Sequence, residues 1–174
     1  MRRSLPLAGL ALTAALCTAA PAQAASTHRA APTPDQLVAR CTGSAVPAAT
    51  SANRRMFAEL QCARKASGLP ALRAFKPIGG VATRWSTHMA QVDHMSHNMQ
   101  RVAQISAVDD QWTKLSEIVG ATQLGAGYVD RIVAHWFRSS VHRHVILNPQ
   151  LRVVGIGIVS GNGWYWTTGD FVDR

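Results

Sequence analysis

The chain of 174 residues carries 18 Lys and Arg against 9 Asp and Glu, which gives a formal net charge of +9 with histidine neutral. The basic residues are spread along the chain, and no run is longer than Arg54-Arg55. Nucleic-acid binding needs a clustered basic stripe or a known motif, so we expect no nucleic-acid partner. The charge favours a solvated basic surface, with attraction to an anionic cell wall or to lipid headgroups as the alternative.

The N-terminus has the order of a secretory signal peptide. Arg2 and Arg3 are positive, residues 5–20 are apolar, and Ala22-Gln23-Ala24 has the small-x-small form of a cleavage site. The apolar stretch is shorter than the ~18 to 20 residues of a membrane-spanning helix. We therefore expect cleavage after Ala24, secretion, and a mature chain without a transmembrane segment. Its about 150 residues suit one domain, and its 16 basic and 9 acidic residues give a net charge of about +7.

Two cysteines remain once Cys17 leaves with the signal peptide. Cys41 and Cys62 form an even pair, and an exported protein folds in an oxidising compartment. Their spacing matches no zinc knuckle. We therefore predict a disulfide between Cys41 and Cys62. It would tie a short N-terminal helix to the first long helix and contribute about 3 kcal/mol.

Helical patterns dominate the first half of the mature chain. Thr33-Pro34-Asp35 is typical of a helix start and predicts a short helix up to Cys41, followed by a loop. One apolar stripe predicts a helix over residues 52–67 that ends at Gly68, and a second predicts a helix that begins at Pro77. The stripes consist of Met56, Leu60 and Ala63 in the first helix and of Ile78, Val81, Trp85, Met89 and Val92 in the second.

The second half of the chain combines a helix with strands. Residues 97–116 are polar and predict a loop with a turn of helix near residues 109–115. The elements predicted after this loop are a strand over residues 117–120, a helix over 128–139, and strands over 151–159 and 164–168. Asn162-Gly163 between the last two strands is a hairpin signal. Helices followed by a terminal hairpin predict an α+β layer structure.

Histidine and glutamate supply the candidate chemistry. His94 and His97 would share one face of a helix, and His142 and His144 would share one side of an extended segment. Glu117 starts an apolar run, where a carboxylate is costly unless it is paired. Two imidazoles and a carboxylate suit a divalent ion such as zinc, or equally a base and its orienting partner for a hydrolytic water. The spacing does not choose between these, nor does it exclude exposed histidines and a structurally bonded Glu117.

Several short motifs follow one another between residues 51 and 171. They are Asn53-Arg54, residues 67–72 (SGLPAL), residues 85–90 (WSTHMA), residues 95–97 (MSH), residues 117–120 (EIVG), residues 133–149 with Trp136, Ser139, His142-Arg143 and ILNP, residues 154–157 (VGIG) and residues 165–167 (YWT). In this order they resemble a bacterial member of the CAP superfamily. That superfamily includes the cysteine-rich secretory proteins, insect venom antigen 5 and plant pathogenesis-related proteins.

The resemblance implies a CAP-type α-β-α sandwich, in which a small antiparallel sheet is flanked by helices. With the signal peptide at residues 1–24, the chain then divides into a linker with a short helix at residues 25–50 and a CAP domain at residues 51–174.

The resemblance also implies a cleft that holds His97, Glu117 and His142. In several relatives the two histidines can bind a divalent metal such as zinc or magnesium. Relatives have been linked to lipid or sterol binding and occasionally to proteolysis, and no single chemistry is shared by all of them. We therefore expect His97 and His142 to be metal ligands of this chain, and all three residues are candidates for catalysis.

The sequence departs from the family pattern in three places. Many eukaryotic relatives carry a second glutamate shortly after the tryptophan that corresponds to Trp136, where this chain has Phe137-Arg138-Ser139. Ile118 stands where Asn is frequent, and Val141 stands where Gly is usual. One carboxylate with two histidines is a poorer acid–base set than two carboxylates, but it is adequate for weak metal binding.

Three functions follow as hypotheses. The first is a binding module with a metal-capable cleft for a lipid or an anionic cell-envelope component. The second is an extracellular hydrolase that activates a water, because no Ser or Cys nucleophile lies in a recognisable elbow and the mature cysteines are expected to be oxidised. The third is a structural or interaction protein with a vestigial cleft. We favour the binding module, acting as a monomer outside the cell.

Overall fold

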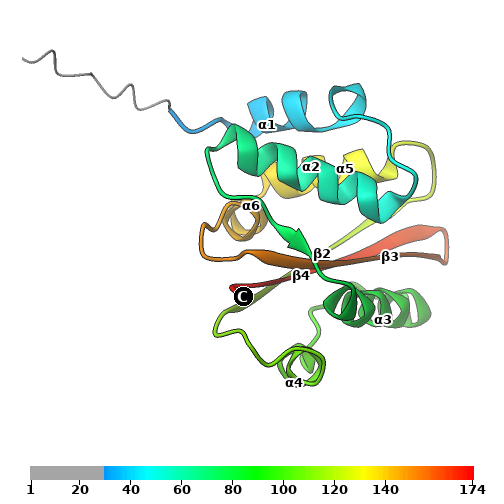
Figure 1. Cartoon of the computed structure of the whole chain (residues 1–174). Coiled ribbons are helices and arrows are strands. Elements are labelled where there is room, and N and C mark those ends of the chain that lie inside the picture. Colours follow the sequence, from blue (N-terminus) through cyan, green and yellow to red (C-terminus); the bar gives the residue numbers. More distant parts are fainter. Residues whose placement is uncertain (1–29) are drawn as a thin grey trace, which may run out of the picture. The chain divides into compact units, whose positions relative to one another are not determined.

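A four-stranded sheet lies at the centre of the computed structural model, which describes residues 30–174 (Figure 1). The strands are β1 (Arg73–Ala74), β2 (Leu115–Gln123), β3 (Val153–Gly161) and β4 (Trp164–Val172). Their order is β1-β3-β4-β2, with β2, β3 and β4 antiparallel and the short β1 parallel to β3. The predicted signal peptide and Cys17 lie outside the described residues.

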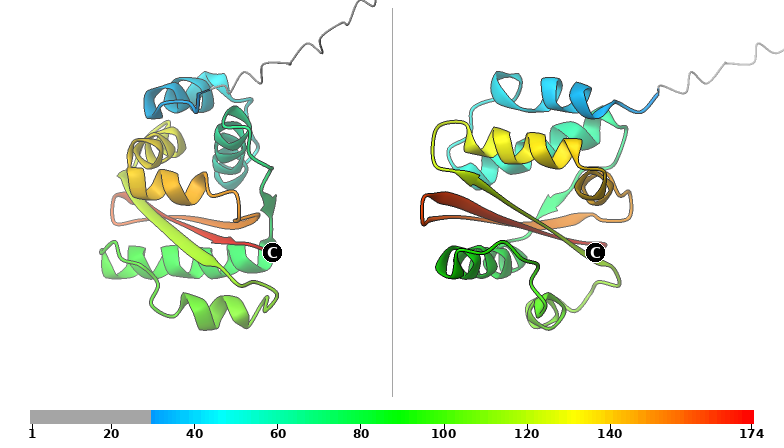
Figure 2. Two further views of the ribbon diagram at one scale, coloured as in Figure 1. Left: turned by 90° about the vertical axis from the view of Figure 1, so that its left-hand side faces the viewer. Right: turned by 180° about the vertical axis from the view of Figure 1, so that it is seen from behind.

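Helices cover both faces of this sheet, as Figures 1 and 2 show from three sides. One face carries α1 (Pro34–Cys41), α2 (Ala52–Ala66), α5 (Tyr128–Arg138) and α6 (Ser140–Ile146), and the other carries α3 (Lys76–Val92) and α4 (Arg101–Ser106). A 3-10 turn, η1 (Gly43–Ala45), follows α1. The predicted α-β-α sandwich is thus confirmed, except that β1 makes the sheet mixed rather than purely antiparallel.

The helices predicted over residues 34–41, 52–67 and 128–139 match α1, α2 and α5, whereas β2 and β4 are longer than predicted and several short elements were placed wrongly or missed. The predicted turn of helix at residues 109–115 is wrong, because the helix in this region is α4, which buries Ile105 against Ile78 and Val81 of α3. The two-residue β1 and the seven-residue α6 were not predicted at all. Elements this short contain too few repeats for an apolar period to show.

Two glycines of β3 bring that strand into backbone contact with α3. A Cβ atom on Gly155 would lie 2.3 Å from the backbone nitrogen of Gly79, and one on Gly157 would lie 2.3 Å from that of Thr83. The Ser86 Oγ atom of α3 lies within hydrogen-bond distance of the Gly157 carbonyl, at 3.1 Å, and of the Thr168 hydroxyl, at 2.9 Å. This contact holds α3 firmly against the middle of the sheet.

The main core lies between the sheet and the layer of α1, α2, α5 and α6. Trp136 and Phe137 of α5 are fully buried there, together with Phe171 of β4. The Trp136 indole Nε1 donates a hydrogen bond to the Val119 carbonyl of β2 at 3.0 Å. Because this bond fixes α5 against β2, it also fixes the residues that flank Trp136.

The predicted disulfide is confirmed. Cys41 at the end of α1 is bonded to Cys62 in α2, and their Cα atoms are 5.4 Å apart, a normal separation for a disulfide. The bond ties the short N-terminal helix to the first long helix. In the same helix α2, Arg64 is fully buried, and its guanidinium donates hydrogen bonds to the carbonyls of Pro70, Ile146, Asn148 and Leu151.

A buried carboxyl group of α2 is paired with a second carboxyl group of α5. Arg55 contacts both Glu59 and Asp130, with its Nη2 atom 3.0 Å from Asp130 Oδ1. Burial and the hydrogen bond with Asp130 raise the pKa of Glu59 to about 8, while the bond with Glu59 lowers the pKa of Asp130. The two groups therefore hold one proton between them near neutral pH, and Arg55 compensates the remaining negative charge.

Substituting Gly157 by Ala tests the close packing of α3 on β3. We expect a loss of about 1 to 3 kcal/mol in the free energy of unfolding, because the added methyl group meets backbone that cannot turn aside. Gly80→Ala is the matched control, since the nearest heavy atom to its Cβ is the flexible Arg84 Nη1 at 3.7 Å. That change should stabilise α3 by up to about 1 kcal/mol. Equal urea midpoints for the two variants would contradict the packing argument.

Glu59→Gln tests the shared proton. A folded pKa of about 8, above the ordinary value of 4.5, means that the native state holds an extra proton between these two pH values. The contribution of Glu59 to stability is therefore full below the lower value and is lost as the pH rises through the upper one. Urea unfolding measures the free energy of unfolding at about pH 5 and at about pH 8. The decrease between these two pH values should be smaller in Glu59→Gln than in the parent protein, by at least about 1 kcal/mol. If the decrease is the same in both proteins, Glu59 is not the group that makes the stability depend on pH in this range.

Candidate functional site

His97 and Glu117 are in direct contact. The His97 Nδ1 atom lies 2.8 Å from Glu117 Oε1, which also accepts a hydrogen bond from the Asn98 backbone N–H at 2.9 Å. The Glu117 side chain, in β2, is 1% exposed, whereas the His97 side chain is 54% exposed. Residues 94–98 are not helical, so the helical face expected for His94 and His97 does not form. The bond from Asn98 instead turns this loop back toward β2.

Asp170 is a third member of this group that sequence reasoning missed. It lies in β4 directly opposite Glu117 and is completely buried. Within residues 30–174, Glu117 Oε2 and both Asp170 oxygens have no hydrogen-bond donor. Burial, followed by the charge of Glu117, raises the pKa of Asp170 well above its ordinary value. The protonated form of Asp170 is therefore favoured, while His97 and the Asn98 backbone N–H contact the other oxygen of Glu117, Oε1.

His142 is held at the start of α6. Its Nδ1 atom lies 2.8 Å from Ser139 Oγ, which leaves Nε2 as the free ring nitrogen. Burial, with further contributions from the charges of His135 and His97, lowers the pKa of His142, so its ring is neutral at physiological pH. The extended arrangement expected for His142 and His144 is wrong. In a helix, residues two positions apart point about 200° apart around the axis.

The donors fit a metal ion only weakly. Among residues 30–174, no three His, Cys, Asp or Glu side chains are placed to hold one. His97 and His142 each have Nδ1 engaged, so Nε2 of each ring remains as a possible ligand. Neutral imidazoles suit zinc, whereas magnesium prefers oxygen ligands. Nitrogen donors of this kind suit zinc, but within residues 30–174 they do not form a closed structural site.

His142 faces a cleft of about 520 Å³, which we call the histidine cleft. Its lining residues are Asp93, Met95, Val119, Gly120, Ala121, His135, His142, Trp164 and Trp166. They come from the end of α3 and the following loop, from β2 and β4, and from α5 and α6. His97 and Glu117 are not among them. The structure thus brings His97 to Glu117, but it places His142 in a neighbouring cleft.

Sequence reasoning missed three of the polar and aromatic groups around this cleft. Asp93 follows α3, whereas Trp164 and Trp166 lie in β4, so their convergence depends on the fold. A signal was available for Asp170, because a carboxylate inside an apolar strand is the same signal that pointed to Glu117.

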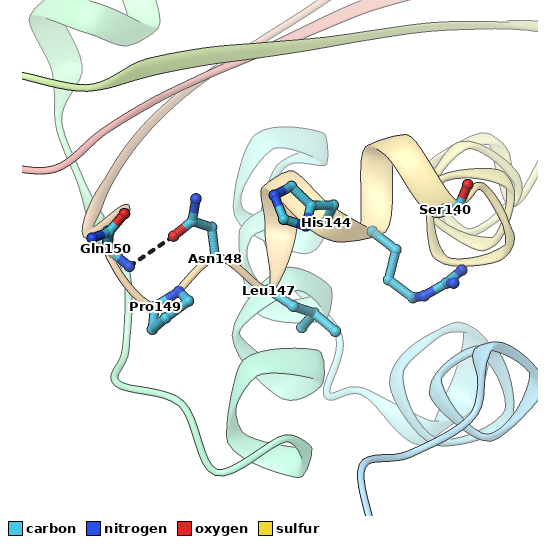
Figure 3. A pocket seen from close by; sticks show the side chains of 7 residues that line it. Ser140, His144, Leu147, Asn148, Pro149 and Gln150 are labelled. Atoms are coloured by element: carbon cyan, nitrogen blue, oxygen red, sulfur yellow. Dashed lines mark hydrogen bonds between the residues drawn. The ribbon is translucent and has the colours of Figure 1, made fainter.

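A second cleft of about 620 Å³ lies along α6 and the loop that follows it, as Figure 3 shows. It is lined by Ser140, Arg143, His144, Leu147, Asn148, Pro149 and Gln150. Three of its polar side chains, Arg143, Asn148 and Gln150, already bond to the protein. Asn148 Oδ1 accepts from the Gln150 backbone N–H at 2.9 Å, and Arg143 Nη1 donates to the Phe137 carbonyl at 2.7 Å. We therefore place the candidate site in the histidine cleft, although it is smaller.

The sequence matches the family model described as the cysteine-rich secretory protein family, CAP, over residues 57–171. This span contains His97, Glu117 and His142, and it omits α1 and the first residues of α2. No curated protein matches the sequence significantly.

Three solved bacterial structures resemble the fold at low sequence identity. An extracellular SCP-domain protein of Bacillus anthracis has a TM-score of 0.60 and 19% identity, over 70% of this chain and 40% of that one. An outer surface protein of Borrelia burgdorferi has a TM-score of 0.64 and 16% identity, over 74% and 97%. A cysteine-rich secretory protein of Staphylococcus aureus has a TM-score of 0.56 and 18% identity, over 74% and 41%.

These likenesses establish the fold, and the chain spans about two fifths of the Bacillus and Staphylococcus proteins. The family match covers most of the described chain, and it includes the three residues expected from the sequence motifs. The chain therefore belongs to the CAP family of cysteine-rich secretory proteins.

Proposed function

We propose that this chain is an exported binding module whose histidine cleft receives a ligand of the bacterial cell envelope. The observation that carries the proposal is the cleft itself. Two imidazoles, a carboxylate and two indoles from separate elements surround one space of about 520 Å³, a size typical of small-molecule sites. The ring centroids of His135 and His142 are 6.0 Å apart, so both imidazoles are available to one ligand.

The placement of Glu117 favours binding over hydrolysis. A general base must reach the proton that it removes, directly or through one water. Glu117 is covered by His97 and Asn98 on one oxygen and faces the buried Asp170 with the other. It does not line the histidine cleft. The carboxyl pair therefore supports the loop that carries His97, and no activated water is needed to explain it.

Charge and family membership point to the envelope as the source of the ligand. The relatives are described as an extracellular and an outer surface protein. The net charge of the whole chain is +9, which favours approach to anionic cell surfaces. Over residues 30–174, none of the helices has the length and apolar character needed to cross a bilayer. A lipid is one such ligand, and it would leave extractable lipid on the purified protein.

Zinc binding by His97 and His142 is the metal prediction of this proposal. Zinc at ten times its dissociation constant should add about 1.4 kcal/mol, or about 3 to 6 °C in melting temperature for a domain of this size. The double variant His97→Ala, His142→Ala should lose the shift, because it removes both free Nε2 ligands. His144→Ala, a change in an exposed histidine, should retain it. An unshifted melting curve for the parent protein would reject the metal site.

Filling the cleft tests the envelope ligand. Ala121→Trp places an indole on the floor of the histidine cleft, while Val108→Trp places one on the surface outside it. Binding is measured by sedimentation of each protein with isolated cell envelopes, and circular dichroism checks that both variants fold. We expect at least a tenfold loss of bound protein for Ala121→Trp and no loss for Val108→Trp. Equal sedimentation of the two variants would exclude this cleft as the binding site.

A further inference from the structure

Asp93 breaks two local rules at the mouth of the histidine cleft. It ends α3 with a left-handed backbone, φ 51°, where glycine is the usual residue. Its carboxylate also lies at the negative end of a helix of 17 residues, where an anion is unfavourable. Gly or Asn at this position would suit both the left-handed backbone and the C-terminus of the helix better. A residue that opposes its own local structure while lining a cleft is expected to serve a ligand.

A second lining segment of the histidine cleft, in β4, presents a partly exposed indole. Trp166 is buried, and its Nε1 donates a hydrogen bond to the Gly161 carbonyl at 3.0 Å. Trp164 is 38% exposed and lies two residues earlier on the same face of β4, with ring centroids 6.5 Å apart. The β3–β4 turn holds this wall in place, because Asn162 Nδ2 donates to the Ala90 carbonyl of α3 at 2.9 Å.

The same bond links the two walls of the cleft. Ala90 belongs to the last turn of α3, three residues before Asp93, and Asn162 precedes Trp164 by two residues. The carboxylate and the exposed indole are therefore carried by two elements that are bonded to each other. His142 adds a free Nε2 from a third element, oriented by Ser139. The cleft is thus a preorganised set of one flat apolar face and several hydrogen-bonding groups.

We propose that the histidine cleft binds a neutral pyranose ring of an envelope oligosaccharide, stacked on Trp164 and hydrogen-bonded through its hydroxyl groups to Asp93 and His142. A pyranose has an apolar face of C–H groups and an edge of hydroxyl groups, which matches these walls. The carboxylate of Asp93 opposes an anionic ligand such as a phosphate headgroup. The inference rests on the proposed function and names its ligand class.

Isothermal titration of the exported chain with chitotriose and with cellotriose tests the inference. We expect saturable binding of at least one trisaccharide. Trp164→Ala should raise its dissociation constant about tenfold or more, the scale of one lost aromatic contact. Val108→Ala is the matched control, because Val108 is also 38% exposed but lies outside the cleft, and it should bind like the parent. Asp93→Asn keeps the left-handed backbone accessible and should weaken binding by removing the charge.

Absence of binding by both trisaccharides, or equal affinity of Trp164→Ala and Val108→Ala, would overturn the inference. Binding of phosphatidylglycerol vesicles in place of either sugar would overturn it as well. Envelope sedimentation of the same preparations separates this failure from that of the proposed function. If sedimentation still depends on the cleft, only the sugar is wrong. If sedimentation is also independent of the cleft, both proposals fall.

Discussion

The close approach of α3 to β3 positions the part of the candidate site that follows α3. Gly155 and Gly157 leave no side chain between the two backbones, so α3 runs directly over the strand. The end of α3 then meets the β3–β4 turn, where Asn162 caps the Ala90 carbonyl. One wall of the histidine cleft belongs to α3 and another to β4, so the contact sets the width of the cleft. Gly155 and Gly157, which lie inside the sandwich, thereby influence the geometry of a cleft at its surface.

Buried carboxyl groups occur in pairs on both sides of the sheet. Each pair contains one fully buried carboxyl group whose pKa is raised, Glu59 in the first and Asp170 in the second, because burial disfavours the charged form. The other acid of each pair contacts polar partners: Asp130 contacts Arg55, and Glu117 contacts His97 and the Asn98 backbone N–H.

The sequence predicted the long elements and the family, but it predicted the site only in part. The helix over Ala52–Ala66 and the Asn162-Gly163 turn have strong local signals, so both were recognised. The contact of His97 with Glu117 joins residues 20 apart, and only the family motifs pointed to it. Asp93 was not recognised, because its strained backbone has no signature in residue order. Helix α6 was not predicted, because seven residues are too few to show a helical period. For the same reason, the segment of His142 and His144 was wrongly predicted to be extended.

Arg64 has a consequence for how sequences with this fold can diverge. Within residues 30–174 its buried guanidinium is stabilised by main-chain carbonyls, at 2.8 to 3.1 Å, that belong to Pro70, Ile146, Asn148 and Leu151. Main-chain acceptors are supplied by any residue type, so these four bonds do not depend on which side chains follow one another in the loop. Lysine at position 64 lacks the planar fork needed to reach all four carbonyls. One buried cation can thereby hold the path of the loop through its backbone and not through its side chains.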